Sequence, residues 1–296
     1  MPNVSANGIQ IEYETFGNDS YPPLLLIMGV GCQMILWPDE FCDMLANRGH
    51  YVIRFDNRDA GLSSKFEEAG VPDIMEVMSS VLQGEEVETP YTLDDMADDT
   101  IGLLDSLNIE TAHVCGLSMG GMIAQVVAYR YPARVLSLLS IMSTTGNPEL
   151  PQGTPEALAV LFDPVPADRE ANIEYNVKVQ QTIGSPGFPF DEDWMRDLAA
   201  RCYDRCFCPQ GTVRQTAAIF AHGNRKPSLA GITAPTLVIH GSEDPLLPVE
   251  GGKDTKESIP GAELLIIDGM GHDLPREVWP QLVDAIAAHT QKASKA

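Results

Sequence analysis

Short, continuous apolar runs alternate with helical patterns along this chain of 296 residues. The apolar runs occur at 23–28, 51–55, 112–115, 135–142, 236–240 and 263–267. Runs of this length predict strands that are buried on both faces. Apolar residues at helical spacing predict helices near 38–48, 92–107, 119–131 and 278–289. This alternation predicts βαβ units, and therefore an α/β fold with a mostly parallel central sheet flanked by helices.

The first residues follow a different pattern. Asn7-Gly8 separates residues 4–6 from residues 9–14, which alternate between apolar and polar positions. Asn-Gly between two such segments is a strong signal for a hairpin with a two-residue turn. We therefore expect a half-exposed hairpin at the start of the chain.

Residues 146–228 interrupt the alternation with mainly helical patterns broken by Pro and Gly. An insertion between two strands of such a sheet lies over the ligand crevice at their carboxyl ends. We expect residues 1–145 and 229–296 to form the core and residues 146–228 to form a helical cap. Residues 66–90 show an irregular, acidic pattern, and their contribution to the pocket stays open.

Gly116-Leu117-Ser118-Met119-Gly120 matches G-x-S-x-G, with an apolar strand before it and a helical pattern after it. This is the strand–turn–helix context that a nucleophile elbow requires. The turn is sharp, so the positions two residues before and after the serine must lack bulk. Glycines at 116 and 120 meet that need, and Ser118 is the candidate nucleophile.

A serine hydroxyl needs a base to become nucleophilic, and the base needs an orienting acid. In proteins with this elbow, the acid and then the histidine follow the serine in the chain. His272 lies in a loop directly after the last predicted strand and is the candidate base. His289 lies within the last predicted helix, where we expect it on the surface. Asp268 and Asp273 flank the base and are expected to serve the turn.

The acid should lie at the end of a strand that precedes the histidine. Glu243 and Asp244 both follow the run at 236–240. Asp244 is favoured because a turn ahead of a proline is the usual place for a short carboxylate to reach inward. The other position of this kind, after residues 135–142, offers only Ser-Thr-Thr.

An oxyanion hole needs backbone N–H donors, which places little constraint on side chains. One donor belongs to the residue after the nucleophile, here Met119. The other comes from the loop after the first buried strand, Met28-Gly29-Val30-Gly31, where we place it at Val30.

These motifs resemble the α/β-hydrolase superfamily over nearly the whole chain. The marks are GLSMGG, GSEDP, GMGH and FDNRDAGLS. The segment LLIMGVGCQMILWPDEF is similar to the aclacinomycin methylesterase group of bacterial serine esterases. Most superfamily members carry His-Gly where this chain has Met28-Gly29, and the methylesterase-like group shares the Met-Gly. The resemblance implies a triad of Ser118, Asp244 and His272, with Val30 and Met119 as the oxyanion donors.

The predicted function is hydrolysis of a small-molecule carboxylic ester through an acyl-enzyme, without a cofactor. The same scaffold hosts carbon–carbon bond hydrolases, lactonases and perhydrolases, and fold does not decide among them. An aspartate-nucleophile dehalogenase or epoxide hydrolase is disfavoured by the serine at 118. A non-catalytic receptor for a small ligand is a further alternative, although all three triad positions are intact.

The net charge limits the classes of binding partner that we expect. The net charge is −23, and no Lys or Arg occurs between Phe66 and Tyr129. A nucleic-acid binder needs a basic surface to replace counterions, and anionic membranes repel an acidic one. We therefore expect neither partner. A composition of 44% hydrophobic and 21% charged residues is typical of a globular protein.

The cysteines and the first residues indicate the compartment. No basic and apolar leader opens the chain, and no apolar run is long enough for a membrane span. A reducing cytoplasm with free thiols is the simplest expectation for the six cysteines. Cys202, Cys206 and Cys208 lie close together, but a structural zinc site needs four ligands, so helix packing is favoured over metal binding.

Overall fold

The structure is a computed structural model that describes residues 2–160 and 162–295. Positions 1, 161 and 296 fall within the ranges predicted for core and cap and lie outside the described residues. The strands are β1 (Asn3–Ala6), β2 (Ile9–Phe16), β3 (Pro23–Ile27), β4 (Tyr51–Phe55), β5 (Ala112–Leu117), β6 (Val135–Ile141), β7 (Thr236–Gly241) and β8 (Glu263–Ile267). The helices are α1 (Asp39–Ala46), α2 (Ile74–Leu82), α3 (Leu93–Ser106), α4 (Met119–Arg130), α5 (Pro155–Ala159), α6 (Arg169–Ile183), α7 (Glu192–Arg205), α8 (Pro209–His222), α9 (Lys226–Leu229), α10 (Val249–Ser258) and α11 (Trp279–Ala293).

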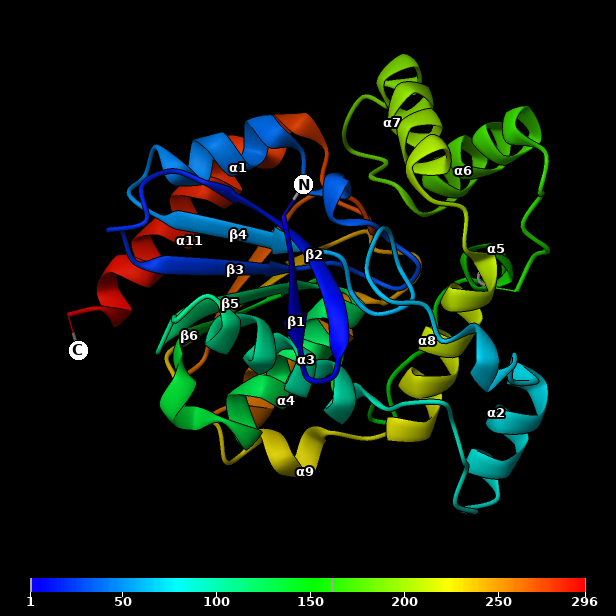
Figure 1. The fold of residues 1–296 in the computed structure, drawn as a ribbon, viewed down its shortest axis with the longest axis horizontal. Helices are drawn as coiled ribbons and strands as arrows, with labels where there is room; N and C mark the ends of the chain where they lie inside the picture. The colour runs from blue at the N-terminus through cyan, green and yellow to red at the C-terminus, as the bar shows by residue number, and fades with distance from the viewer. Residues whose placement is uncertain (1, 161, 296) are drawn as a thin grey trace.

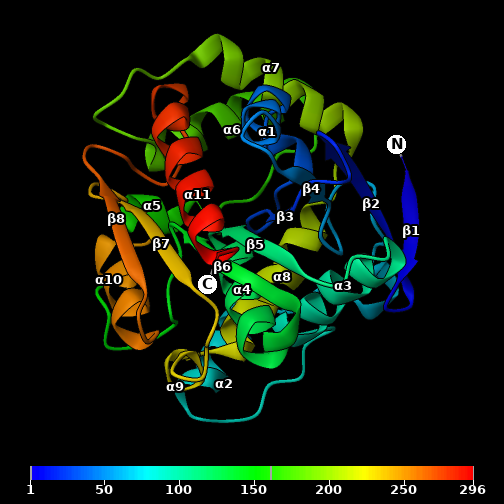
Figure 2. The ribbon, with the colours of Figure 1, turned by 90° about the vertical axis from the view of Figure 1, so that its left-hand side faces the viewer.

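Within the described residues the strands form one eight-stranded sheet in the order β1-β2-β4-β3-β5-β6-β7-β8. The pairs β1–β2 and β2–β4 are antiparallel, and every other pair is parallel. Helices α1 and α11 cover one face, while α3 and α4 cover the other (Figures 1 and 2). The predicted α/β fold with a mostly parallel, helix-flanked sheet is confirmed.

The central strands read as continuous apolar runs because both faces of the sheet are covered. In β3, Leu24 and Leu26 pack into the cluster that contains Phe41 of α1 and Leu282 of α11. Leu25 and Ile27 point the other way, into the cluster that contains Leu104 of α3 and Ile123 of α4. Each such side chain stabilises the fold by about 1.5–3 kcal/mol relative to exposure to water.

The hairpin at the start of the chain forms as predicted. Ala6 pairs with Ile9, so Asn7 and Gly8 make the two-residue turn. Their φ angles of 48° and 78° are both positive. This conformation matches the type I′ turn that Asn-Gly favours.

Two helices were not predicted. The segment expected to be irregular contains α2, whose N-cap Asp73 accepts hydrogen bonds from the backbone of Met75 and Glu76. An aspartate N-cap ahead of apolar residues is a recognisable start signal, so the irregular interpretation of 66–90 was wrong for residues 74–82. In contrast, α10 contains adjacent glycines at 251 and 252, which lower the intrinsic helix propensity.

The insertion at residues 146–228 supplies α5 to α8, which gather beyond the carboxyl ends of the strands (Figure 1). Its last residues belong to α9, which packs against α4 and α10 rather than with α5 to α8. Helix α2 lies beside α8, so part of segment 66–90 contacts the insertion. Among the described residues, no helix combines the length and apolar character needed to cross a membrane.

Three histidines are buried near the amino-terminal edge of the parallel strands. The rings of His50 and His113 have centroids 6.4 Å apart, and His289 donates a hydrogen bond from its Nε2–H to the Pro235 carbonyl, 3.2 Å away. His289 is 7% exposed, so the expectation of a surface position was wrong. His289 lies on the buried side of α11. Its imidazole contacts Pro235, directly before β7. Burial lowers the pKa of all three, that of His113 to about 4.

These histidines predict loss of stability in mild acid. The unfolded chain binds protons at them near the ordinary pKa of 6.5, whereas the folded chain binds them at lower pH. Stability contributed by the neutral rings is therefore present above pH 6.5 and is lost as the pH falls toward 4. Each unit of pKa difference corresponds to about 1.4 kcal/mol.

The measurement is urea unfolding of wild type and His113→Gln between pH 7.5 and 5. The variant should be less stable at pH 7.5 but lose less stability on acidification, and equal losses would contradict the prediction.

Candidate functional site

Ser118 lies in a tight turn between the end of β5 and the start of α4, with φ 56°. A side chain at position 116 would place its Cβ 1.9 Å from the Gly120 carbonyl oxygen. A side chain at position 120 would meet the Ile27 carbonyl oxygen at 2.1 Å. Glycine is therefore required at both positions, for the steric reason that the sequence indicated.

Hydrogen bonds from the neighbouring strand β6 brace this turn. The Ser118 N–H donates to the Ile141 carbonyl at 2.9 Å, and the Ser143 hydroxyl donates to the Ser118 carbonyl, also at 2.9 Å. Both partners come from the end of β6 or the residues just after it. The backbone that carries the Ser118 hydroxyl is thus fixed from the adjacent strand.

The three residues predicted to form a triad lie together. His272 Nε2 is 3.0 Å from Ser118 Oγ, and His272 Nδ1 is 2.7 Å from Asp244 Oδ2. A carboxylate only accepts, so Nδ1–H donates to Asp244 and Nε2 is free to accept the serine proton. The side chains come from the turn after β5, the turn after β7 and the loop after β8, and all three residues are buried. This is the order and spacing that a nucleophile, base and orienting acid need.

The structure distinguishes the two candidate acids. Glu243 is exposed, whereas Asp244 is buried against the histidine. Asp244 Oδ1 also accepts hydrogen bonds from the N–H groups of Leu246 and Leu247, at 2.9 and 2.8 Å. Burial on its own raises the pKa of Asp244, but His272 and His240 beside it outweigh burial and hold that pKa well below its usual range. Asp244 is therefore an anion at neutral pH.

The predicted oxyanion donors border the serine. The Cys32 N–H closes a turn on the Gly29 carbonyl at 3.2 Å, which leaves the Val30 N–H outside the turn's own hydrogen bond. A Cβ at position 29 would lie 3.4 Å from the Ser118 Cβ, so this turn lies directly against Ser118. Met119 is the first residue of α4, and such a residue has no intrahelical partner for its N–H. The roles of Val30 and Met119 stay predictions.

The insertion holds the turn that carries Val30, which the sequence did not reveal. Gln215 of α8 is fully buried and accepts a hydrogen bond from the Gly31 N–H at 2.7 Å. Its amide donates to the Arg58 carbonyl at 2.7 Å, so one side chain joins two loops. Nothing in the local pattern around a glutamine of a helix signals such a contact between residues 184 positions apart.

Buried ion pairs explain the segment FDNRDAGLS that follows β4. Asp56 pairs with Arg205 of α7 at 2.7 Å and accepts from the Met34 N–H at 2.8 Å. Asp59 receives two hydrogen bonds from Arg214 of α8, at 2.7 and 2.8 Å, and both side chains are fully buried. The two aspartates thereby fasten α7 and α8 to the loops beside the serine.

The other sequence candidates have structural contacts. Asp268 accepts a hydrogen bond at 3.2 Å from the hydroxyl of Ser242, which lies in the turn after β7, so it joins that turn to its own loop after β8. Cys202, Cys206 and Cys208 are free thiols, and Cys202 packs against the apolar cluster that joins Met34 to α7. The described ranges 2–160 and 162–295 contain no group of three or more His, Cys, Asp or Glu side chains suited to a metal ion.

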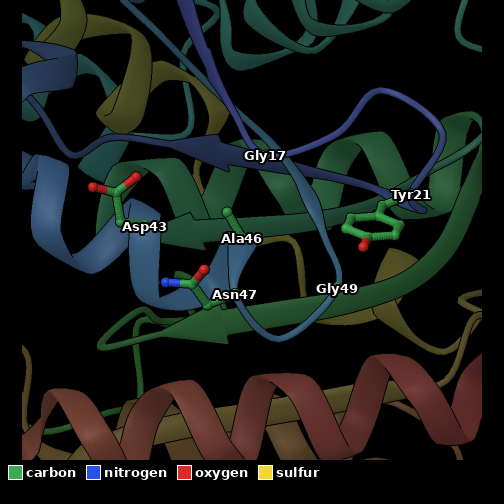
Figure 3. Close-up of a pocket in the computed structure, with 6 residues that line it drawn as sticks. All are labelled: Gly17, Tyr21, Asp43, Ala46, Asn47 and Gly49. Carbon is green, nitrogen blue, oxygen red and sulfur yellow. The ribbon is translucent and has the colours of Figure 1, made fainter.

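A separate surface hollow lies at the opposite edge of the sheet (Figure 3). Its lining comes from the ends of β2 and α1 and the turn before β4, namely Gly17, Tyr21, Asp43, Ala46, Asn47 and Gly49. Parallel strands begin at this edge, whereas Ser118 follows the carboxyl end of β5. The hollow is therefore not part of the serine site.

Comparison with known proteins identifies the family. A family model described as "alpha/beta hydrolase fold" matches residues 22–275. The chain belongs to the α/β-hydrolase fold family. The match spans β3, the turn at Ser118, the insertion and the loop with His272, so it includes every element of the site described above.

Two related proteins match nearly the whole chain. It is 31% identical to rhodomycin D methylesterase DnrP of Streptomyces peucetius and 30% identical to rhodomycin D methylesterase DauP of Streptomyces sp. (strain C5). Each alignment covers 98% of both proteins. Among solved structures, the meta-cleavage product hydrolase CumD of Pseudomonas fluorescens IP01 is similar, with a TM-score of 0.75 and 21% identity over 99% of this chain and 98% of that one. The expected resemblance to bacterial methylesterases is confirmed.

The buried ion pair between Asp59 and Arg214 is expected to be important for the stability of the fold. Arg214→Met removes the cation and leaves a buried carboxylate without compensation, which should lower the free energy of unfolding by about 3–5 kcal/mol. The matched control is Arg169→Met, which breaks the exposed pair with Asp204 within the insertion. The control should leave the urea midpoint nearly unchanged. If both variants shift the midpoint equally, Arg214 is not a buried tie between α8 and the core.

Proposed function

We propose that this protein is a serine carboxylic-ester hydrolase. The carrying observation is the continuous hydrogen-bonded chain from Asp244 through His272 to the Ser118 hydroxyl, at 2.7 and 3.0 Å. Full-length similarity to two methylesterases supports the choice of an ester among the bonds that such a triad cleaves. Ester hydrolysis needs no group beyond the side chains and backbone donors that line this site.

In the first half of the reaction, Ser118 Oγ bonds to the ester carbonyl carbon as its proton moves to His272 Nε2. The carbonyl oxygen becomes an anion held by the N–H groups of Val30 and Met119. The bond to the alkoxy oxygen then breaks, and the alcohol leaves with the proton from His272. Asp244, an anion beside Nδ1, stabilises the imidazolium throughout.

In the second half, water gives a proton to His272 Nε2 and its oxygen attacks the acyl-enzyme. A second oxyanion forms in the same place, and its collapse breaks the bond to Ser118 Oγ. The serine recovers the proton from His272, and the carboxylic acid leaves. Every proton is thus returned, and the enzyme ends as it began.

We infer that the substrate is a methyl ester without an anionic group next to the scissile carbonyl. The relatives support methanol as the leaving group. Charge is a second argument, since Arg58 of the loop after β4, Arg205 of α7 and Arg214 of α8 are each paired with a carboxylate of this chain. These cations are already neutralised and do not favour an anionic substrate.

We further propose that α5 to α8 serve as the cap over this site and that the protein works in the cytoplasm. Their position beyond the carboxyl ends of the strands supports the first proposal. Six free cysteines support the second, because thiols persist in reducing compartments. The net charge of −23 disfavours nucleic acid as a partner.

The main test is hydrolysis by wild type and Ser118→Ala. Substrates are p-nitrophenyl esters from acetate to palmitate, together with the methyl, ethyl and butyl esters of the same acids. Ser118→Ala should lower kcat by about 10⁴-fold or more, because the nucleophile is lost. Ser106→Ala, which removes an exposed hydroxyl far from the site, should match wild type. Cleavage of a β-diketone in place of every ester would reject the ester assignment, and cleavage of a lactone alone would restrict it to cyclic esters.

A second test concerns the acid. Asp244→Asn should lower kcat by about 10⁴-fold, because an amide at this place favours the wrong tautomer of His272. Glu243→Gln, its exposed neighbour, is the matched control and should retain wild-type kcat. Equal losses in both variants, or loss in Glu243→Gln alone, would show that Asp244 does not orient the base.

A further inference from the structure

The loop that carries His272 lies against the segment between α6 and α7. The Gly187 N–H donates to the Gly269 carbonyl at 2.9 Å, and the His272 N–H donates to the Ile183 carbonyl at 2.8 Å. The two backbones approach so closely that a Cβ at position 271 would lie 2.2 Å from the Gly184 carbonyl oxygen. The candidate base is therefore held, through its own backbone N–H, by a residue of the insertion.

One hydroxyl links the two sides of this contact. Ser185 Oγ accepts from the Gly271 N–H at 2.8 Å and donates to Asp273 Oδ1. A backbone N–H can only donate, so the serine proton is left for the carboxylate. Gly271 and Asp273 are the immediate neighbours of His272, so Ser185 forms hydrogen bonds to the loop on both sides of the base.

The loop that Ser185 contacts, residues 269–273, contains two glycines and has a flexible backbone. Gly269 and Gly271 flank Met270, and Gly269 has φ 73°. Glycine has more conformational freedom than any other residue, so contacts from outside must define such a loop. On its other side the loop is tied to the turn of the acid, where the Glu243 N–H donates to the Met270 carbonyl at 3.0 Å.

We propose that Ser185 and Asp273 are positioning residues that set the imidazole of His272 between Asp244 and Ser118. This inference rests on the proposed function, since it assigns His272 the part of the base. The insertion then contributes to proton transfer through the base as well as to the shape of the site. Neither residue touches the reacting atoms, and both act through the backbone of residues 271 and 272.

The test uses variants of Ser185 with a conservative rescue. Ser185→Ala removes both hydrogen bonds, and Ser185→Thr retains a hydroxyl. A small misplacement of a base costs up to about 100-fold in rate, so Ser185→Ala should lower kcat by about 10- to 100-fold with KM little changed. Ser185→Thr should recover most of that loss. Tyr203→Phe, which removes one hydrogen bond to the Ala167 carbonyl elsewhere in the insertion, is the matched control and should keep wild-type kcat.

A second readout needs no substrate. The His272 Nδ1–H that donates to Asp244 gives a downfield proton resonance in NMR spectra of protein labelled at histidine. The resonance should be present in wild type, Ser185→Thr and Tyr203→Phe, and broadened or lost in Ser185→Ala. An unchanged resonance in Ser185→Ala would overturn the positioning role, even if its thermal midpoint falls. If wild type hydrolyses no ester, the proposed function fails, whereas this spectrum still decides whether Ser185 positions the imidazole.

Discussion

The backbone of Ser118, held at φ 56°, is the constraint on which the rest of the site depends. Such a conformation at a non-glycine residue costs about 1–3 kcal/mol and persists only where its surroundings leave no alternative. Here the surroundings are the ends of two adjacent strands and the close packing at Gly116 and Gly120. Because the turn is fixed, Ser118 Oγ projects from the carboxyl end of β5, and the other groups need only reach that one point.

The remaining groups reach that point with the help of buried charge. The loop after β4 carries Asp56 and Asp59 into the interior, where Arg205 and Arg214 of the insertion meet them. A buried ion pair gives little net stability over an apolar pair, but either charge alone is very unfavourable. The pairs therefore favour one placement of α7 and α8 over others. That placement brings Gln215 to the turn with Val30.

Much of this arrangement could be predicted from the sequence. Strands of the core were visible as apolar runs, because a sheet covered on both faces needs apolar residues at nearly every position. The grouping of Ser118, Asp244 and His272 could be predicted because strand–turn–helix context and chain order limit the choices to a few residues. Asp244 and Glu243 were harder to separate, since neighbouring residues in a turn differ in direction and not in pattern.

Other features could not be predicted, for physical reasons that differ. Helix α10 carries two adjacent glycines, and the second fits where a Cβ would lie 2.6 Å from His240 Nδ1, so packing and not propensity explains its place. His289 lies on the buried stripe of a helix whose rotation relative to the sheet depends on the whole fold. The contacts of Gln215 and Ser185 join residues far apart in the chain, and no local periodicity encodes them.

The insertion contacts the site on two opposite sides, through Gln215 at the turn with Val30 and through residues 183–187 at the loop with His272. This limits how such a protein can diversify. An accessory domain can be shortened, exchanged or excised when it only borders a site, but here excision would release both loops. New substrate ranges are therefore expected to arise from point changes on the inner surfaces of α5 to α8, while the length and the anchoring residues of the insertion stay as they are.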